Sequence, residues 1–85
     1  MDALARRRKE LDRLDQKIIF LLQGRLEKCR QIGLWKRKKK ISITQPQRES
    51  EMIRRLRPQR YSRFLLPIFK EIVKQSKRLQ RGLKP

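Results

Sequence analysis

The sequence contains no histidine and only one cysteine, Cys29, among its 85 residues. A lone cysteine cannot form a disulfide within the chain, and without histidine no recognisable zinc or haem site can be assembled. Metal-dependent chemistry and histidine-based catalytic triads are therefore excluded. We expect a protein that uses no metal and no cofactor.

Long apolar runs are also lacking. No stretch approaches the roughly 20 apolar residues that a membrane-spanning helix needs, and the N-terminus has no apolar signal-peptide core. The arginine-rich start is similar to a transit peptide, but Glu10, Asp12 and Asp15 follow it directly. We therefore expect a cytoplasmic protein with no membrane partner.

Acidic residues are scarce, with 8 Asp and Glu against 26 Lys and Arg, which gives a formal net charge of +18. A chain this short forms one domain, residues 1–85, and its small core is weakened further by self-repulsion. Oligomerisation is the natural remedy, because no disulfide or metal can strengthen the fold. The charge also suggests a polyanionic partner, and nucleic acid is the commonest one for a small basic protein.

Three helices are predicted, and the first is much the longest. No proline occurs from Asp2 to Lys40, and apolar residues recur there at spacings of three and four, which predicts one amphipathic helix over about 3–39. Such a helix is about 54 Å long, roughly twice the diameter of a compact chain of this size. The rest of the chain cannot cover it. It must therefore pack against a second copy or another partner.

The segment 41–47 reads as an extended connection before two shorter helices. Pro46 suits the first turn of a helix over about 46–56, which Pro58 terminates. The third helix is expected over about 62–81, with Ser62 as its N-cap and a loosened or kinked first turn at Pro67. The fold class is all-α.

Polar residues interrupt the apolar faces of these helices. Arg25 and Lys36 are eleven residues apart, so both project from one face, roughly 16 Å apart, together with Ile18 and Ile32. Each could simply reach water or pair with a carboxylate. With only eight acids in the chain, however, the negative partners for both could come from a ligand instead.

The other two helices carry similar interruptions. Glu49 lies on the apolar side of the second helix, and Ser76 and Gln80 are neighbours at i and i+4 on the third. Together with Arg25 and Lys36 they predict a polar pocket within a helical bundle, suited to a small, oxygen-rich anion. Most other basic residues are expected on outer faces, and Arg37, Arg55 and Lys77 are among them.

Three segments resemble one family in particular. These are LDRLDQKIIFLLQGR at 11–25, with Gly33 and Lys36 beyond it, PQRE at 46–49, and FKEIVKQSKRLQ at 69–80. In order and spacing they are similar to the all-helical (type II) chorismate mutases over nearly the whole chain. The resemblance implies an intertwined homodimer of three-helix chains, with two equivalent active sites that rearrange chorismate to prephenate in phenylalanine and tyrosine biosynthesis.

The resemblance also implies roles for individual residues. The two carboxylates of the substrate would be held by Arg25 and by Arg8 of the partner chain, helped by Arg48 and Ser76. The ether oxygen of the breaking bond would accept hydrogen bonds from Lys36 and Gln80. The ring hydroxyl would be held by Glu49. Gln45 belongs to the substrate-binding set but stands where an acid is usual, so altered affinity is expected there.

Three alternatives to a chorismate mutase remain open. A nucleic-acid binder would explain the charge, but the chain has one Trp and one Tyr to offer as stacking platforms. An isochorismate pyruvate-lyase would share the fold and the cationic residues, whereas Glu49 favours the mutase. A helical dimer without activity is the third.

Overall fold

The computed structural model describes residues 2–42 and 46–83, and it is all-helical, as predicted. Helix α1 spans Ala3–Lys39, α2 spans Pro46–Leu56 and α3 spans Ser62–Arg81. The described residues contain no strand. The prediction of three helices with a very long first helix is confirmed.

Both ends of α1 are capped by local hydrogen bonds. The Asp2 side chain accepts a bond of 2.6 Å from the backbone N–H of Ala5, and the helix then runs through Gly24 and Gly33 without a break. At its end Lys40 adopts the left-handed conformation, with φ 56°. The N–H groups of Lys40 and Ile41 bond to the carbonyls of Arg37 and Lys36, at 3.2 and 2.8 Å. This pair of bonds is a Schellman motif, which satisfies carbonyls that the helix end leaves unpaired.

Helix α3 begins differently from the prediction. Its N-cap is Tyr61, which adopts a left-handed conformation and makes no side-chain capping bond, so the prediction of Ser62 as the N-cap was wrong. The N–H groups of Phe64 and Leu65 both bond to the Tyr61 carbonyl, each at 2.9 Å. This backbone bonding closes the first turn without a side-chain cap. The helix continues unbroken through Pro67.

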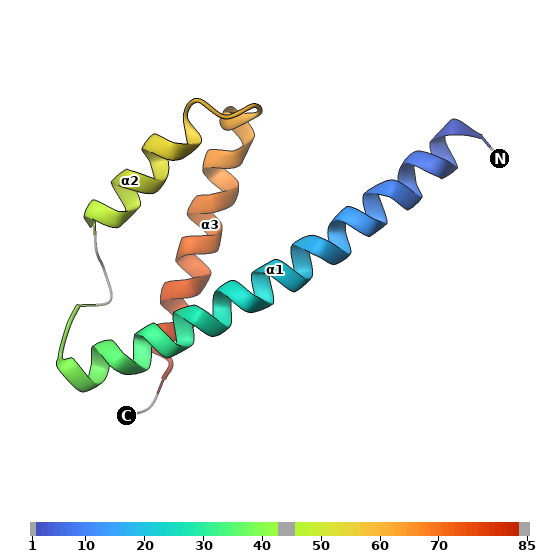
Figure 1. Cartoon of the computed structure of the whole chain (residues 1–85). Helices are drawn as coiled ribbons and strands as arrows, with labels where there is room; N and C mark the ends of the chain where they lie inside the picture. Colours follow the sequence, from blue (N-terminus) through green and yellow to red (C-terminus); the bar gives the residue numbers. More distant parts are fainter. Residues whose placement is uncertain (1, 43–45, 84–85) are drawn as a thin grey trace.

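The three helices form an open, elongated arrangement (Figure 1). Helix α3 packs against both α1 and α2, and it crosses α1 within the C-terminal half of that helix. The N-terminal half of α1 extends away from the other two helices. The radius of gyration is 16.4 Å, whereas a compact chain of this length has about 12 Å. One chain alone therefore leaves much of α1 uncovered.

The described residues bury very little apolar surface. Leu56, at 9% exposure, is the one apolar side chain among them that counts as buried. The N-terminal half of α1 presents instead a stripe of exposed apolar side chains: Leu4, Leu11, Leu14, Ile18 and Leu21. Exposed apolar area of this extent marks an interaction surface. Within the described ranges no helix is both long enough and apolar enough to cross a membrane.

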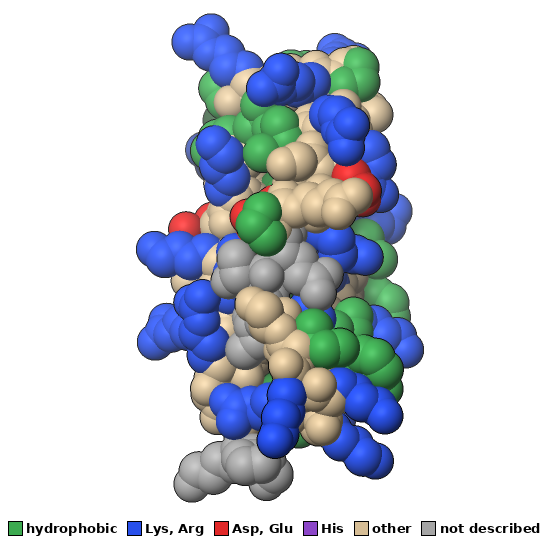
Figure 2. Space-filling model, turned by 90° about the vertical axis from the view of Figure 1, so that its left-hand side faces the viewer, with side chains coloured by type: hydrophobic (Ala, Val, Ile, Leu, Met, Phe, Trp, Pro, Cys, Tyr) green, Lys and Arg blue, Asp and Glu red, His purple; other side chains and the backbone are tan. Residues whose placement is uncertain are grey.

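On one face of the molecule the basic side chains are spread out rather than gathered in one place (Figure 2). Figure 2 shows Lys and Arg along the whole length of the face that it displays, with apolar patches between them. Part of this charge supports the fold locally, because the last turn of α1 contains Lys36, Arg37, Lys38 and Lys39. Cations at a helix C-terminus interact favourably with the helix dipole.

Candidate functional site

A polar pocket lies between the C-terminal half of α1 and the facing sides of α2 and α3. It encloses about 140 Å³. Its lining comes from all three helices: Arg25, Cys29, Lys36, Arg48, Glu49, Met52, Arg55, Val73, Ser76, Lys77 and Gln80. Because the three helices contribute residues far apart in the sequence, the pocket exists only in the folded chain.

Arg25 points into this pocket and is held by α3. Its Nη1 donates a hydrogen bond of 2.6 Å to the Oγ of Ser76 and a longer one of 3.6 Å to the Sγ of Cys29. The Ser76 hydroxyl in turn donates to the Ile72 carbonyl at 2.8 Å. Ser76 is 6% exposed, so its two bonds satisfy a hydroxyl that water cannot reach freely. The guanidinium has further N–H groups for a carboxylate ligand.

Gln80 is fixed against α1 by one bond and one close approach. Its Nε2 donates to the Cys29 carbonyl at 2.8 Å, and the residue is 6% exposed. It lies over Gly33, the buried glycine of α1: a Cβ built there would come within 2.8 Å of Gln80 Cγ and 3.2 Å of Gln80 Cβ. A side-chain amide has two N–H groups, so the bond to Cys29 leaves one for a ligand.

Glu49 provides the negative charge of the pocket and forms an ion pair with Lys77. The pair joins Glu49 Oε1 on α2 to Lys77 Nζ on α3. Glu49 lies in the first turn of α2, where the helix dipole stabilises a carboxylate. The ion pair therefore fixes an acceptor at the pocket wall.

The charge of the pocket is strongly positive. Five of its lining residues are cations and one is an acid, which leaves four positive charges in excess: Arg25, Lys36, Arg48, Arg55 and Lys77 against Glu49. Clustered cations in a cleft focus the electric field and attract anions. Arginine guanidinium groups in particular match the geometry of a carboxylate. The arrangement suits a small anionic ligand that carries carboxylate groups.

Six of the predicted site residues lie together here: Arg25, Lys36, Arg48, Glu49, Ser76 and Gln80. Arg8 is exposed in the N-terminal half of α1 and is not among the residues that line the pocket of its own chain. Gln45 falls outside the described residues. Ile18 and Ile32, predicted on the same face as Arg25 and Lys36, are 52% and 47% exposed and do not line the pocket.

Two basic residues were misplaced by the sequence prediction. Lys77 is half-buried and lines the pocket, although it was expected on an outer face, whereas Arg55 borders the pocket but is exposed, as predicted. Arg37 is half-buried, and its Nη2 donates to the Arg81 carbonyl at the end of α3, at 2.8 Å. For Lys77 the signal was its spacing, because it follows Val73 by four residues and precedes Gln80 by three. A helical residue at that spacing borders the same face.

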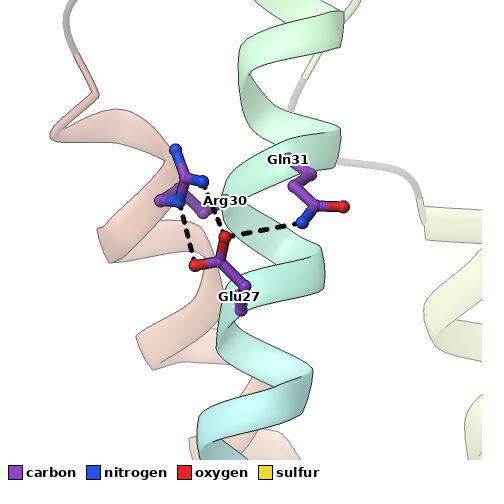
Figure 3. A network of polar contacts seen from close by, with 3 residues as sticks. All are labelled: Glu27, Arg30 and Gln31. Carbon is purple, nitrogen blue, oxygen red and sulfur yellow. Dashed lines mark hydrogen bonds and ion pairs between the residues drawn. The ribbon is translucent and has the colours of Figure 1, made fainter.

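Two acidic residues outside the pocket, Glu27 and Glu10, form ion pairs on α1. Glu27 accepts bonds from Arg30 at 2.6 and 3.0 Å and from Gln31 at 3.4 Å (Figure 3). The bond from Arg30 holds the pKa of Glu27 below its ordinary value, and Glu27 raises the pKa of Arg30. Near the start of the helix Glu10 pairs with Arg7, at 3.3 Å. These exposed pairs contribute little to stability.

Comparison with known proteins gives one family and one curated relative. The family described as chorismate mutase type II matches residues 7–81. The bifunctional chorismate mutase/prephenate dehydratase of Aquifex aeolicus (strain VF5) is 34% identical over 92 aligned residues. The alignment covers 99% of this chain and 25% of the relative, so the chain spans about a quarter of that protein's length. No solved structure matches significantly.

Proposed function

Because the chain belongs to the chorismate mutase type II family, we propose that its polar pocket binds chorismate and catalyses the rearrangement to prephenate. The observation that carries the proposal is the meeting of Arg25, Lys36, Glu49 and Gln80 in one cavity. The ligand would bring carboxylates to a pocket that carries four positive charges in excess.

The reaction suits a site without histidine. The rearrangement is pericyclic: the C–O bond of the ether breaks while a C–C bond forms, so it needs no nucleophile and no proton transfer. The protein must fold a flexible substrate into its reactive conformation, which is a matter of orientation. It must also stabilise the negative charge that develops on the ether oxygen, and one well-placed donor can supply about 3 kcal/mol.

Each task is assigned to particular side chains in this proposal. Arg25, already oriented by its bond to Ser76, would bind one substrate carboxylate with help from Arg48. Lys36 and the second N–H of Gln80 would donate to the ether oxygen. Glu49 would accept the hydrogen bond of the ring hydroxyl. Gln45, by its position before α2, is proposed to contribute to binding as well.

A homodimer is part of the proposal. The exposed apolar stripe on α1 needs another apolar surface to pack against, and a second copy of the same helix offers a matching one. In such a dimer the extended N-terminal half of α1 would carry Arg8 into the site of the partner, where it would bind the other carboxylate. The pocket of a single chain would then be incomplete.

The direct test is a steady-state assay of the purified protein with chorismate, followed by ultraviolet absorbance, together with sedimentation to count subunits. Turnover to prephenate by a dimer is expected. A salt-sensitive gel shift with nucleic acid and no turnover would favour a polyanion binder instead. Turnover of isochorismate to pyruvate and salicylate, with chorismate untouched, would favour the lyase.

Replacing Gln80 with Glu is expected to make activity depend on pH. An amide donates its N–H at any pH, whereas a carboxyl group must be protonated before it can donate to the ether oxygen or to the Cys29 carbonyl. The rate of the wild type should be nearly flat across neutral pH, and the variant should gain activity as the pH falls. Profiles of kcat against pH check this. Gln80→Leu, which has no donor, should be poor at every pH. A flat profile for Gln80→Glu would contradict the assigned role.

Replacing Gly33 with Ala is expected to lower activity about 10- to 100-fold without unfolding the protein. The added Cβ displaces the Gln80 side chain, so the donor moves away from the ether oxygen, and small displacements of catalytic groups are costly. Gly24→Ala is the matched control, because a Cβ there meets nothing within 4 Å. The control should gain about 1 kcal/mol of helix stability with unchanged kcat. Equal activities of the two variants would show that Gly33 does not position Gln80.

A further inference from the structure

The ion pair between Lys77 and Glu49 connects two helices at the wall of the pocket. Lys77 extends from α3 with its side chain 21% exposed, and Glu49 comes from α2 with its side chain 36% exposed. Both residues line the pocket. The pair is therefore partly shielded from water, and it lies where a bound ligand would touch it.

Glu49 has other potential cationic partners close by. Arg25, Lys36, Arg48 and Arg55 line the same small cavity, and a carboxylate among several cations pairs with whichever the packing brings nearest. Pairing with Arg25 or Lys36 would occupy the very groups that the substrate needs. Lys77 instead holds Glu49 Oε1 toward α3. A carboxylate has two oxygens, so Glu49 can still accept a hydrogen bond from a ligand.

We infer that Lys77 is a positioning residue that fixes the Glu49 carboxylate for a hydroxyl-bearing substrate and thereby sets the selectivity of the pocket for that hydroxyl. The inference rests on the proposed function. Its physical basis is that a site built to hydrogen-bond a substrate hydroxyl strongly disfavours analogues without it, and such discrimination is lost when the acceptor is free to move. By contrast, the loss of one positive charge alone would weaken the binding of all dicarboxylates to a similar extent.

The test compares chorismate with its ring-hydroxyl methyl ether, which keeps both carboxylates and the breaking ether bond. The ratio of kcat/KM for the two substrates measures selectivity for the hydroxyl. In Lys77→Met that ratio is expected to fall about 10-fold or more. The value of kcat/KM for chorismate itself is expected to fall about 10- to 100-fold. Lys77→Arg, which keeps the charge, should recover most of both. Lys74→Met, on the exposed surface of the same helix, is the control and should match the wild type.

A double-mutant cycle shows whether Lys77 acts through Glu49. If it does, Lys77→Met should change the selectivity ratio in the wild type but hardly at all in Glu49→Gln. The double variant also leaves no unpaired charge, so it stays informative even if Lys77→Met alone folds poorly. An unchanged ratio in Lys77→Met, or equal effects in both backgrounds, would overturn the inference while the mutase proposal stands. A wild type that does not turn over chorismate would overturn the proposed function and, with it, this inference.

Discussion

Lys36→Ala is expected to lose several powers of ten in kcat while its helical content and subunit count stay unchanged. Lys36 lines the pocket from the last turn of α1, and in the proposed mechanism its ammonium group stabilises the charge that grows on the ether oxygen. Preorganised donors aimed at developing charge make large contributions to rate. The substrate carboxylates would still bind to arginine, so KM should change much less than kcat.

The measurement is steady-state kinetics alongside circular dichroism and sedimentation. Lys36→Met keeps the aliphatic stem and should be as inactive as Lys36→Ala, which would separate lost charge from lost packing. Lys38→Ala is the matched control, because Lys38 lies in the same helical turn but is exposed to solvent. A loss of only a few-fold in Lys36→Ala would mean that this ammonium group does not act on the reacting bond.

Arg8→Ala and Arg25→Ala are each expected to be nearly inactive, yet to recover activity when the two are unfolded, mixed and refolded together. In the proposed dimer one site uses Arg25 of one chain and Arg8 of the other. A mixed dimer therefore contains one site with both arginines and one with neither. At equal amounts half of the dimers are mixed, so about a quarter of all sites should be intact.

The control for this experiment is a pair of variants whose substituted residues both come from the same chain at each site. Arg25→Ala and Lys36→Ala affect residues that one chain brings to one pocket, so every site of their mixed dimer lacks one of the two groups. That mixture should stay inactive. No recovery with Arg8→Ala and Arg25→Ala, or equal recovery in both mixtures, would contradict the shared site.

Most of the fold follows from local rules that the sequence displays. The uninterrupted apolar spacing before Lys40 determines one long helix, and neither Gly24 nor Gly33 breaks it, because each costs only about 1 kcal/mol against many helical bonds. Pro46 and Pro58 bound α2 through the geometry of proline itself. The start of α3 was less predictable. There Tyr61 occupies the N-cap position through backbone geometry alone, and no side-chain pattern in the sequence predicts this N-cap.

The site divides in a similar way. Charge within an apolar stripe and the i, i+4 spacing of Ser76 and Gln80 depend on helical periodicity, so the sequence by itself determined that Arg25, Lys36, Ser76 and Gln80 face the pocket. Which groups meet depends on how the helices cross, and spacing along one helix cannot give that. Only the tertiary structure paired Lys77 with Glu49, bonded Arg25 to Ser76, and placed Gln80 over Gly33. These contacts join residues far apart in the sequence, and they form because α3 packs against α1 and α2 at one particular position.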